Sequence, residues 1–226
     1  MGWNEWVRTA EIEPSIYAAD FSRLGEQIET LMQAGARIFQ FDVGDGHFVE
    51  PITIGPIVLK SISPIVHRLG GVLDCHLMVE TPEKHFRQIA EAGGDSVTVH
   101  YEACEDLLGV IRQARELELG VGVAFNPETE PDDVVAVAGE LVDLVLCMSI
   151  HPGYSGQPFM PETIPRLRRL RELLPERVHV QVDGGVGPDN ATEIRQAGAN
   201  LLVAGTSIFG QEDIAEAYRR LAQAIA

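Results

Sequence analysis

Short apolar runs alternate along the chain with longer stretches in which apolar residues recur every three or four positions. Such runs are typical of buried strands, and the longer stretches are typical of amphipathic helices. Eight strand-like runs cover residues 13–17, 37–43, 72–78, 96–100, 120–125, 144–149, 178–183 and 201–205. Between the first two, Leu24, Ile28 and Leu31 have helical spacing. The pattern therefore predicts strands and helices in regular alternation.

Eight strand–helix units in a chain of 226 residues favour a (β/α)8 TIM barrel of class α/β. We expect one domain over residues 1–226, with residues 1–10 as an N-terminal extension. A doubly wound open sheet is the alternative, but it often carries a GxGxxG turn that this chain lacks. Glycines, which often end helices in the left-handed conformation, follow the predicted helices at 34–36, 92–94, 117–120 and 197–199.

Ionisable side chains interrupt three of the apolar runs near their ends. They are Asp42, His76 and Asp183. The C-terminal ends of barrel strands meet at the face that holds the active sites of this fold, so we expect the three to converge. Two carboxylates and an imidazole suit a bound divalent cation and proton transfer at carbon. Taken singly, such an Asp often caps a helix and such a His often lies hydrogen-bonded in the core, so the hypothesis depends on the set.

Two further features could enclose a ligand above this face. Strand alternation places Met78 on the same face as His76, and Met148 has the equivalent position on the sixth strand. The Gly-rich stretch HPGYSGQPF, residues 151–159, suits a lid, although an ordinary surface loop has the same composition.

Glycines and hydroxyls follow the last two strands. Gly184 and Gly185 come after the seventh, and Gly205, Thr206 and Ser207 after the eighth. In TIM barrels the corresponding loops often bind phosphate through backbone N–H groups and a helix N-terminus. Neither loop contains Lys or Arg, so we expect backbone amides to bind the anion.

Charge and cysteine content limit the partners and the compartment. The chain has 17 basic and 34 acidic residues and a net charge of −17, which argues against nucleic acid and anionic membranes as partners. Cys75, Cys104 and Cys147 show no CxxC spacing, which suits reduced thiols. The chain has neither a signal-like start nor an apolar run of membrane-spanning length, so we expect a cytoplasmic protein.

Nine segments resemble, in order, those of the ribulose-phosphate 3-epimerase family. The resemblance runs from about residue 11 to residue 222 and implies epimerisation at C3 of a ketose phosphate. It also implies a divalent cation (Zn, Fe, Mn or Co), a sugar-phosphate substrate and a homo-oligomer. The segments are PSIYAADF, DGHFV, ITIGP, CHLMVETPEKHF, AEAGGDSVTVHYEA, GVAFNPET, VDLVLCMSIHPGYSGQPF, VDGGV and AGTSIFG.

The resemblance also implies residue roles. Asp42 and Asp183 would be the acid/base pair and also metal ligands, with His76 as a further ligand. The residues expected to contact the substrate or its phosphate are Ser15, Met78, Met148, Gly153, Gly156, Gly184, Gly185, Gly205 and Thr206.

Five positions depart from the family pattern at the centre of the expected site. Gln40 stands where the family has a His ligand, and an amide oxygen is a weaker ligand for zinc-like cations than imidazole. Gly44 replaces a Met, which we expect to open space, and Tyr17, which replaces the usual Leu, could refill that space. Glu50 and Pro51 replace the usual Pro-Asn pair.

These departures leave alternatives open. The favoured function is interconversion of D-ribulose 5-phosphate and D-xylulose 5-phosphate. Another sugar phosphate is possible, as is other chemistry, such as that of a lyase, decarboxylase or different isomerase, at an altered metal site. A non-catalytic phosphate binder would not need two opposed Asp residues.

Overall fold

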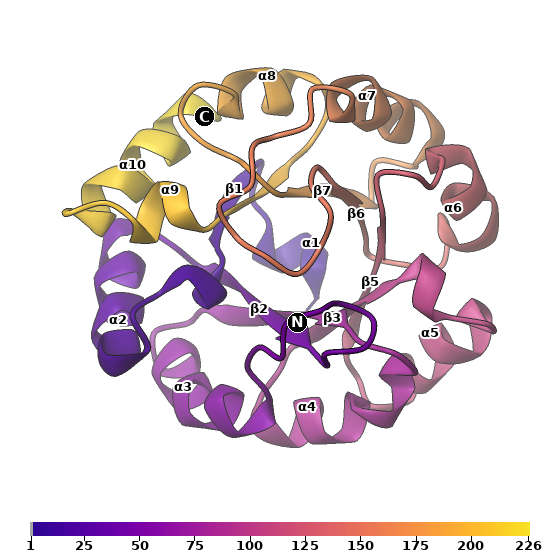
Figure 1. Ribbon diagram of the computed structural model, residues 1–226, viewed down its shortest axis with the longest axis horizontal. Coiled ribbons are helices and arrows are strands. Elements are labelled where there is room, and N and C mark those ends of the chain that lie inside the picture. Colours follow the sequence, from indigo (N-terminus) through magenta and orange to yellow (C-terminus); the bar gives the residue numbers. More distant parts are fainter. Residues whose placement is uncertain (1) are drawn as a thin grey trace.

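The computed structural model describes residues 2–226 and shows eight parallel strands in a ring, surrounded by helices (Figure 1). Hydrogen bonds join the strands in the order β1-β8-β7-β6-β5-β4-β3-β2, and a bridge between Ser15 and Gln40 links the two ends of this order. The predicted TIM barrel is therefore confirmed. The strands are β1 (Glu11–Pro14), β2 (Ile38–Gly44), β3 (Val72–Met78), β4 (Ser96–His100), β5 (Gly120–Phe125), β6 (Leu144–Met148), β7 (His179–Asp183) and β8 (Leu201–Ala204).

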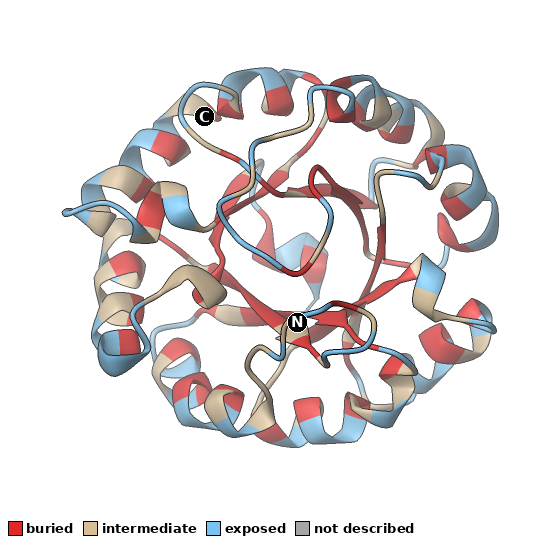
Figure 2. Ribbon diagram, viewed as in Figure 1, coloured by how far each residue is buried: buried red, intermediate tan, exposed pale blue. Residues whose placement is uncertain are grey.

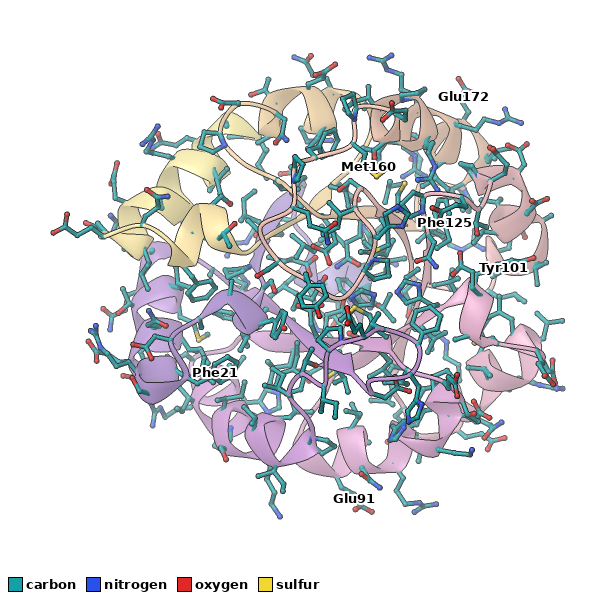
Figure 3. All side chains as sticks on the ribbon, in the orientation of Figure 1. Phe21, Glu91, Tyr101, Phe125, Met160 and Glu172 are labelled. Carbon is teal, nitrogen blue, oxygen red and sulfur yellow. The ribbon has the colours of Figure 1, made fainter. Side chains whose placement is uncertain are left out.

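Helices cover the outside of the ring and bury their inner sides, as the red and blue stripes of Figure 2 show. Charged side chains such as Glu91 and Glu172 project outward from them (Figure 3). The α-helices are α1 (Trp3–Trp6), α2 (Leu24–Ala34), α3 (Pro56–Arg68), α4 (Phe86–Ala92), α5 (Leu107–Glu116), α6 (Pro131–Ala138), α7 (Thr163–Leu173), α8 (Ala191–Gln196), α9 (Thr206–Phe209) and α10 (Ile214–Ala224). The short 3-10 helices are η1 (Ile16–Ala18), η2 (Phe21–Arg23), η3 (Pro82–Lys84) and η4 (Tyr101–Ala103). No helix in residues 2–226 has both the length and the apolarity to cross a membrane.

The second to eighth strands lie within one residue of their predicted bounds, and larger differences occur at two places. The first strand ends at Pro14, because the next residues turn into the 3-10 helix η1 instead of extending the strand to residue 17. Glycines in the left-handed conformation end α2 and α4 as predicted, with φ of 117° at Gly35 and 91° at Gly93. After α5 the prediction was wrong, because Glu118 takes the left-handed conformation (φ 59°) and Gly120 already belongs to β5.

The interior of the ring contains buried polar side chains beneath the predicted site. Glu13 on β1 and Asp74 on β3, hereafter the lower carboxyl pair, are 0% and 1% exposed. Gln181 on β7 joins them, since its Nε2 donates to Glu13 Oε2 at 2.9 Å and to Asp74 Oδ2 at 3.1 Å. Ser96 and Thr98 donate to the other oxygen of Asp74 at 2.7 and 3.1 Å. The sequence patterns did not predict this network.

The N-terminal residues close the opposite end of the barrel. Trp3 and Trp6 of α1 are only 2% and 9% exposed and contact each other edge to face at 5.2 Å. They belong to one apolar cluster with Ile38, Leu144 and Leu201, which are the first residues of β2, β6 and β8. In Figure 1, α1 is accordingly seen faintly through the ring. The extension expected at residues 1–10 thus includes a plug for the end of the barrel away from the site.

Candidate active site

Three strands bring Asp42, His76 and Asp183 together as the sequence predicts. Their ligand atoms all lie within 4.8 Å of one another. His76 Nδ1 is 3.0 Å from Asp42 Oδ1 and 3.9 Å from Asp183 Oδ2. Each residue lies at the C-terminal end of its strand or within two residues of it. The parallel register of β2 and β3 pairs Asp42 with His76 and so places the two side by side. Asp42 and Asp183 are hereafter the upper carboxyl pair.

The crowding of these groups changes their proton affinities. Burial and then the negative charge of Asp42 raise the pKa of Asp183 to about 7. Burial alone would lower the pKa of His76, but the hydrogen bond and charge of Asp42 and the charge of Asp183 raise it above its ordinary value. The site therefore favours added positive charge, whether a proton or a metal cation.

Gln40 lies between the two carboxylates of the upper pair. Its Nε2 donates to Asp42 Oδ1 at 2.7 Å and to Asp183 Oδ2 at 2.9 Å. Its Oε1 is buried without a hydrogen-bond partner. The amide nitrogen, which is no metal ligand, thus faces the carboxylates, and a turned amide would be needed before Gln40 could offer its oxygen to a cation.

The donor set nonetheless fits a divalent cation. Two carboxylates and one imidazole nitrogen converge, and the mutual repulsion of the carboxylates would be relieved by a cation between them. Three protein ligands with room for substrate oxygens are typical of catalytic rather than structural metal sites.

Ser15, expected to contact substrate, also positions Asp42. Its hydroxyl donates to Asp42 Oδ2 at 2.7 Å, so both oxygens of this carboxylate have partners. Ser15 follows β1 directly and is 7% exposed. The hydrogen bonds to both oxygens restrict rotation of the Asp42 carboxylate.

A small cavity of about 40 Å³ lies above the upper carboxyl pair. Pockets for small ligands typically measure about 300–1,000 Å³, so a sugar phosphate cannot enter without movement of the walls. Met78 and Met148 both line the cavity, as their strand positions predict. The other lining residues are Ser15, Tyr17, Asp42, Ile150, Pro152, Gly153, Tyr154, Ser155 and Asp183.

The loop after β6 forms the upper wall of this cavity and extends over the centre of the ring, and the loop after β2 lies over the side of the ring formed by β2 and β3 (Figure 1). The two loops meet, since Tyr154 Oη donates to Glu50 Oε2 at 3.1 Å. Gly153 packs against Val49 and Pro51, which would lie 3.3 and 3.2 Å from an added Cβ. This position over the site supports a lid rather than an ordinary surface loop.

The space expected at Gly44 is not open. A Cβ at this position would lie 2.9 Å from Val49 Cγ2, 3.0 Å from Pro51 O and 3.1 Å from Thr53 Cγ2. The loop after β2 therefore folds into the volume that a longer side chain would need. Tyr17 does line the cavity, as proposed from the sequence, but it does not replace a missing side chain at position 44.

The glycines after β7 have conformations and neighbours that disfavour side chains. Gly184 and Gly185 have φ of 117° and 62°. A Cβ on Gly184 would lie 2.5 Å from Ile150 Cγ1, and one on Gly185 would collide with the backbone of Phe159. Gly185 is exposed, so its backbone is accessible to a ligand.

The loop after β8 lies beside this turn and beside the lid. A Cβ on Gly205 would be 3.8 Å from Ser15 Cβ, and one on Gly156 would be 3.7 Å from Thr206 Cγ2. The hydroxyl of Ser207 is buried and has no hydrogen-bond partner. Residues expected to hold phosphate therefore gather from three loops around one side of the barrel mouth.

Sequence reasoning missed the residues behind His76. His76 Nε2 lies 2.9 Å from His100 Nε2, and His100 Nδ1 lies 3.4 Å from Glu102 Oε2. Burial lowers the pKa of His100 to about 4. The signal was present in the sequence, since His100 is the last residue of the strand predicted at residues 96–100.

Comparison with known proteins identifies the relatives of this chain. The sequence model of the "Ribulose-phosphate 3 epimerase family" matches residues 11–209. Ribulose-phosphate 3-epimerase of Synechocystis is 43% identical over 211 residues, which are 91% of this chain and 90% of the relative. The enzymes of the same name from Bacillus subtilis and Escherichia coli K12 are 39% and 40% identical and cover 90% and 89% of this chain and 94% and 90% of the relatives.

Solved structures show the same fold at low sequence identity. Tryptophan synthase of Mycobacterium tuberculosis superposes with a TM-score of 0.72 at 15% identity, covering 96% of this chain and 93% of that one. KGPDC of Streptococcus mutans also gives 0.72, at 11% identity, covering 96% and 98%. These structural similarities establish the barrel fold alone, whereas the sequence relatives establish the family. The chain belongs to the ribulose-phosphate 3-epimerase family.

Proposed function

We propose that this protein is a ketose-phosphate 3-epimerase, an isomerase of the pentose phosphate pathway that interconverts D-ribulose 5-phosphate and D-xylulose 5-phosphate. The observation that carries the proposal is the convergence of Asp42, His76 and Asp183 within 4.8 Å at the barrel mouth, in a chain of this family. The relatives named for this reaction match about nine tenths of the chain.

The upper carboxyl pair would transfer the protons. One carboxylate removes the proton from C3 and leaves an enediolate, and the carboxyl group of the other returns a proton to the opposite face of C3. The reverse reaction exchanges the two roles. A divalent cation (Zn, Fe, Mn or Co) held by Asp42, His76 and Asp183 would supply positive charge to the C2 and C3 oxygens and so favour the enediolate.

Other residues would prepare the site for this step. Ser15 holds the plane of Asp42 through its 2.7 Å hydrogen bond. Met78 and Met148 line the cavity and would exclude water from the enediolate. The contact between Tyr154 and Glu50 must open to admit the substrate and can re-form above it.

The phosphate would bind at the three glycine-bearing loops, to backbone N–H groups of Gly184, Gly185, Gly205 and Thr206 and of the lid between Gly153 and Gly156. The unpaired hydroxyl of Ser207 supports this position, because a buried donor without a partner is costly unless a ligand completes it. The net charge of −17 makes such local donors necessary for an anionic substrate.

A panel of ketose phosphates assayed in deuterium oxide, with and without added Zn²⁺, Fe²⁺, Mn²⁺ or Co²⁺, tests the proposal. We expect ribulose 5-phosphate to exchange the C3 hydrogen for deuterium while its carbon skeleton is unchanged. We expect ribulose without phosphate to react at least about 100-fold more slowly, because remote binding energy positions the reacting carbon. Comparable turnover of the two sugars would contradict the phosphate site.

Gln40 supports a second candidate, an epimerase for another sugar phosphate or a barrel lyase or isomerase with an altered metal site. Its amide nitrogen occupies the space between the carboxylates where a metal-binding side chain is expected. Deuterium incorporation into a different ketose phosphate, or cleavage of the carbon skeleton in the same panel, would favour this candidate.

We also propose a homo-oligomer in the cytoplasm. The family resemblance supports the oligomer, and the reduced cysteines support the location, since Cys75, Cys104 and Cys147 are all free. Light scattering of the purified protein would test the assembly.

A further inference from the structure

Two buried histidines share a single hydrogen below the proposed cation site. The rings of His76 and His100 stack with centroids 5.0 Å apart and an interplanar angle of 26°. Both side chains are 0% exposed, and their Nε2 atoms are 2.9 Å apart. At this distance one nitrogen must carry the hydrogen and the other must accept it. The groups at the far ends of the two rings decide which nitrogen is the donor.

Each far end faces a carboxylate. His76 Nδ1 faces Asp42 Oδ1 at 3.0 Å and Asp183 Oδ2 at 3.9 Å. His100 Nδ1 is buried without a hydrogen-bond partner, and its nearest charged group is Glu102 Oε2 at 3.4 Å. Phe48 covers the His100 ring at a centroid distance of 4.7 Å. The row of groups thus runs from the site through both imidazoles to Glu102.

Glu102 is fixed in place by the loop that follows β5. Its Oε1 accepts hydrogen bonds from the backbone N–H of Asn126 at 2.8 Å and from the hydroxyl of Thr129 at 2.5 Å. Arg166 holds this loop, because its Nη2 donates to the carbonyls of Asn126 and Thr129 at 2.7 and 2.8 Å. The side chain of Glu102 is 24% exposed, and this partial burial would raise its pKa, but His100 and these donors lower it to about 2. Glu102 is therefore a carboxylate and can only accept hydrogen.

The tautomers follow from this acceptor. Facing a carboxylate, His100 places its hydrogen on Nδ1 and its lone pair on Nε2. His76 must then donate from Nε2 to His100. The opposite arrangement would turn the His100 Nδ1 lone pair toward the negative charge of Glu102. The proposed arrangement turns the His76 Nδ1 lone pair toward Asp42 at 3.0 Å, and a cation held at that position removes the repulsion. With its hydrogen on Nε2, His76 has its lone pair on Nδ1, the nitrogen that faces Asp42 and Asp183.

We propose that His100 and Glu102 are positioning residues that fix the tautomer of His76 and so direct its Nδ1 lone pair toward a divalent cation held with Asp42 and Asp183. Neither residue lines the cavity, so both act through His76. The inference rests on the proposed cation site but not on the identity of the sugar. Carboxylates and imidazoles behind a metal-bound His typically change metal affinity by about 10–100-fold.

The central test is Glu102→Gln, because an amide keeps the shape of the side chain but loses its charge. Zn²⁺ affinity is measured without substrate, by competition with a chromogenic chelator. We expect a loss of about 10–100-fold in Glu102→Gln. Glu105→Gln is the matched control, since Glu105 is an exposed residue near Glu102 and its substitution removes the same charge. It should leave the affinity unchanged.

The tautomers themselves are read by 15N-detected NMR of histidine-labelled, metal-free protein. We expect His100 to carry its hydrogen on Nδ1 in the parent chain and to shift toward the Nε2–H form in Glu102→Gln. Two results would overturn the positioning role of His100 and Glu102 while leaving the epimerase proposal intact. One is a Zn²⁺ affinity of Glu102→Gln within twofold of that of Glu105→Gln, and the other is a His100 that keeps the Nδ1–H form in Glu102→Gln.

A second pair of variants covers the case in which Glu102→Gln does not fold. In His100→Gln the side chain can still offer an acceptor to His76 Nε2, whereas in His100→Phe it cannot. If His100 positions His76, His100→Gln should bind Zn²⁺ more strongly than His100→Phe, at equal thermal stability. Equal affinities would refute this role, and so would a parent chain that binds no divalent cation, which would also remove the cation from the proposed mechanism.

Discussion

The barrel contains two pairs of carboxyl groups, each bridged by a glutamine amide, and Asp183 is the one member that is only half-buried. Gln40 Nε2 donates to both members of the upper carboxyl pair, and Gln181 Nε2 donates to both members of the lower pair. In both glutamines the amide oxygen is buried without a hydrogen-bond partner. Burial raises the pKa of Asp183 in the upper pair and of both Glu13 and Asp74 in the lower pair.

The pairs differ in what lies beside them. The upper pair has the Nδ1 of His76 within 4 Å and lines a cavity under a lid. The lower pair has the hydroxyls of Ser96 and Thr98 on one member, and neither member lines that cavity. Two acids and an amide are therefore not a reactive site by themselves. A further metal ligand and access for a substrate make the difference.

The largest effect should come from neutralising the upper pair. We expect Asp42→Asn and Asp183→Asn each to lower turnover by at least about 100-fold, because each removes a positioned proton-transfer group. Glu13→Gln is the matched control from the lower pair and should retain activity. Steady-state epimerase rates measure all three. Near-normal rates in either Asn variant would refute the two-base mechanism, and a comparable loss in the control would erase the distinction between the pairs.

The affinity of the upper carboxyl pair for a divalent cation should depend steeply on pH. The pKa of Asp183 is raised to about 7, so a cation must displace a proton from the site at lower pH. Affinity should be constant well above pH 7 and should fall about tenfold per pH unit below it for each proton displaced. Chelator competition at pH 5 to 8.5 measures this slope. A flat profile would contradict the raised pKa of Asp183.

Replacing the bridging amide of the upper pair should strengthen metal binding. We expect Gln40→His to raise Zn²⁺ affinity about tenfold or more, because imidazole is a better ligand for such cations than an amide oxygen. Gln40→Leu, which removes the bridge without adding a ligand, is the control. Elemental analysis and epimerase rates would be measured together. Higher metal content without ketose-phosphate turnover would favour the second candidate function.

The comparison also shows how far the sequence can predict such a barrel. Asp42, His76 and Asp183 were predictable, because each interrupts an apolar run near the end of a strand whose place in the fold is known. The lower pair was not, since contact between Glu13 and Gln181 requires the register of strands far apart in sequence. The same holds for the N-terminal residues, because nothing local to Trp3 indicates that it closes the ring.

Local sequence also left the orientation of side chains undecided. The pattern indicated that Gln40 enters the site, but only the positions of both carboxylates determine that its nitrogen faces them. Likewise the loss of a side chain at Gly44 suggested open space, while the fold of the following loop fills that volume with Val49 and Thr53. Both outcomes depend on packing between segments rather than on residue type.

The smallest effect we expect is on stability, and it separates the pairs by pH. Burial, then the charge of Asp74, raises the pKa of Glu13 well above its usual 4.5, so this residue stays protonated in the folded chain where the unfolded chain releases the proton. Its contribution to stability is full below pH 4.5 and is lost as the pH rises toward the folded pKa. Gln at position 13 has no such proton to lose. The melting temperature of Glu13→Gln relative to the parent should therefore rise between pH 4.5 and 8. The rise is about 2–4 °C for each kcal/mol of stability that the parent loses through Glu13 over this range. Glu105→Gln, at an exposed site, should show no such trend. A difference between Glu13→Gln and the parent that stays constant over this range would contradict a raised pKa of Glu13 in the folded protein.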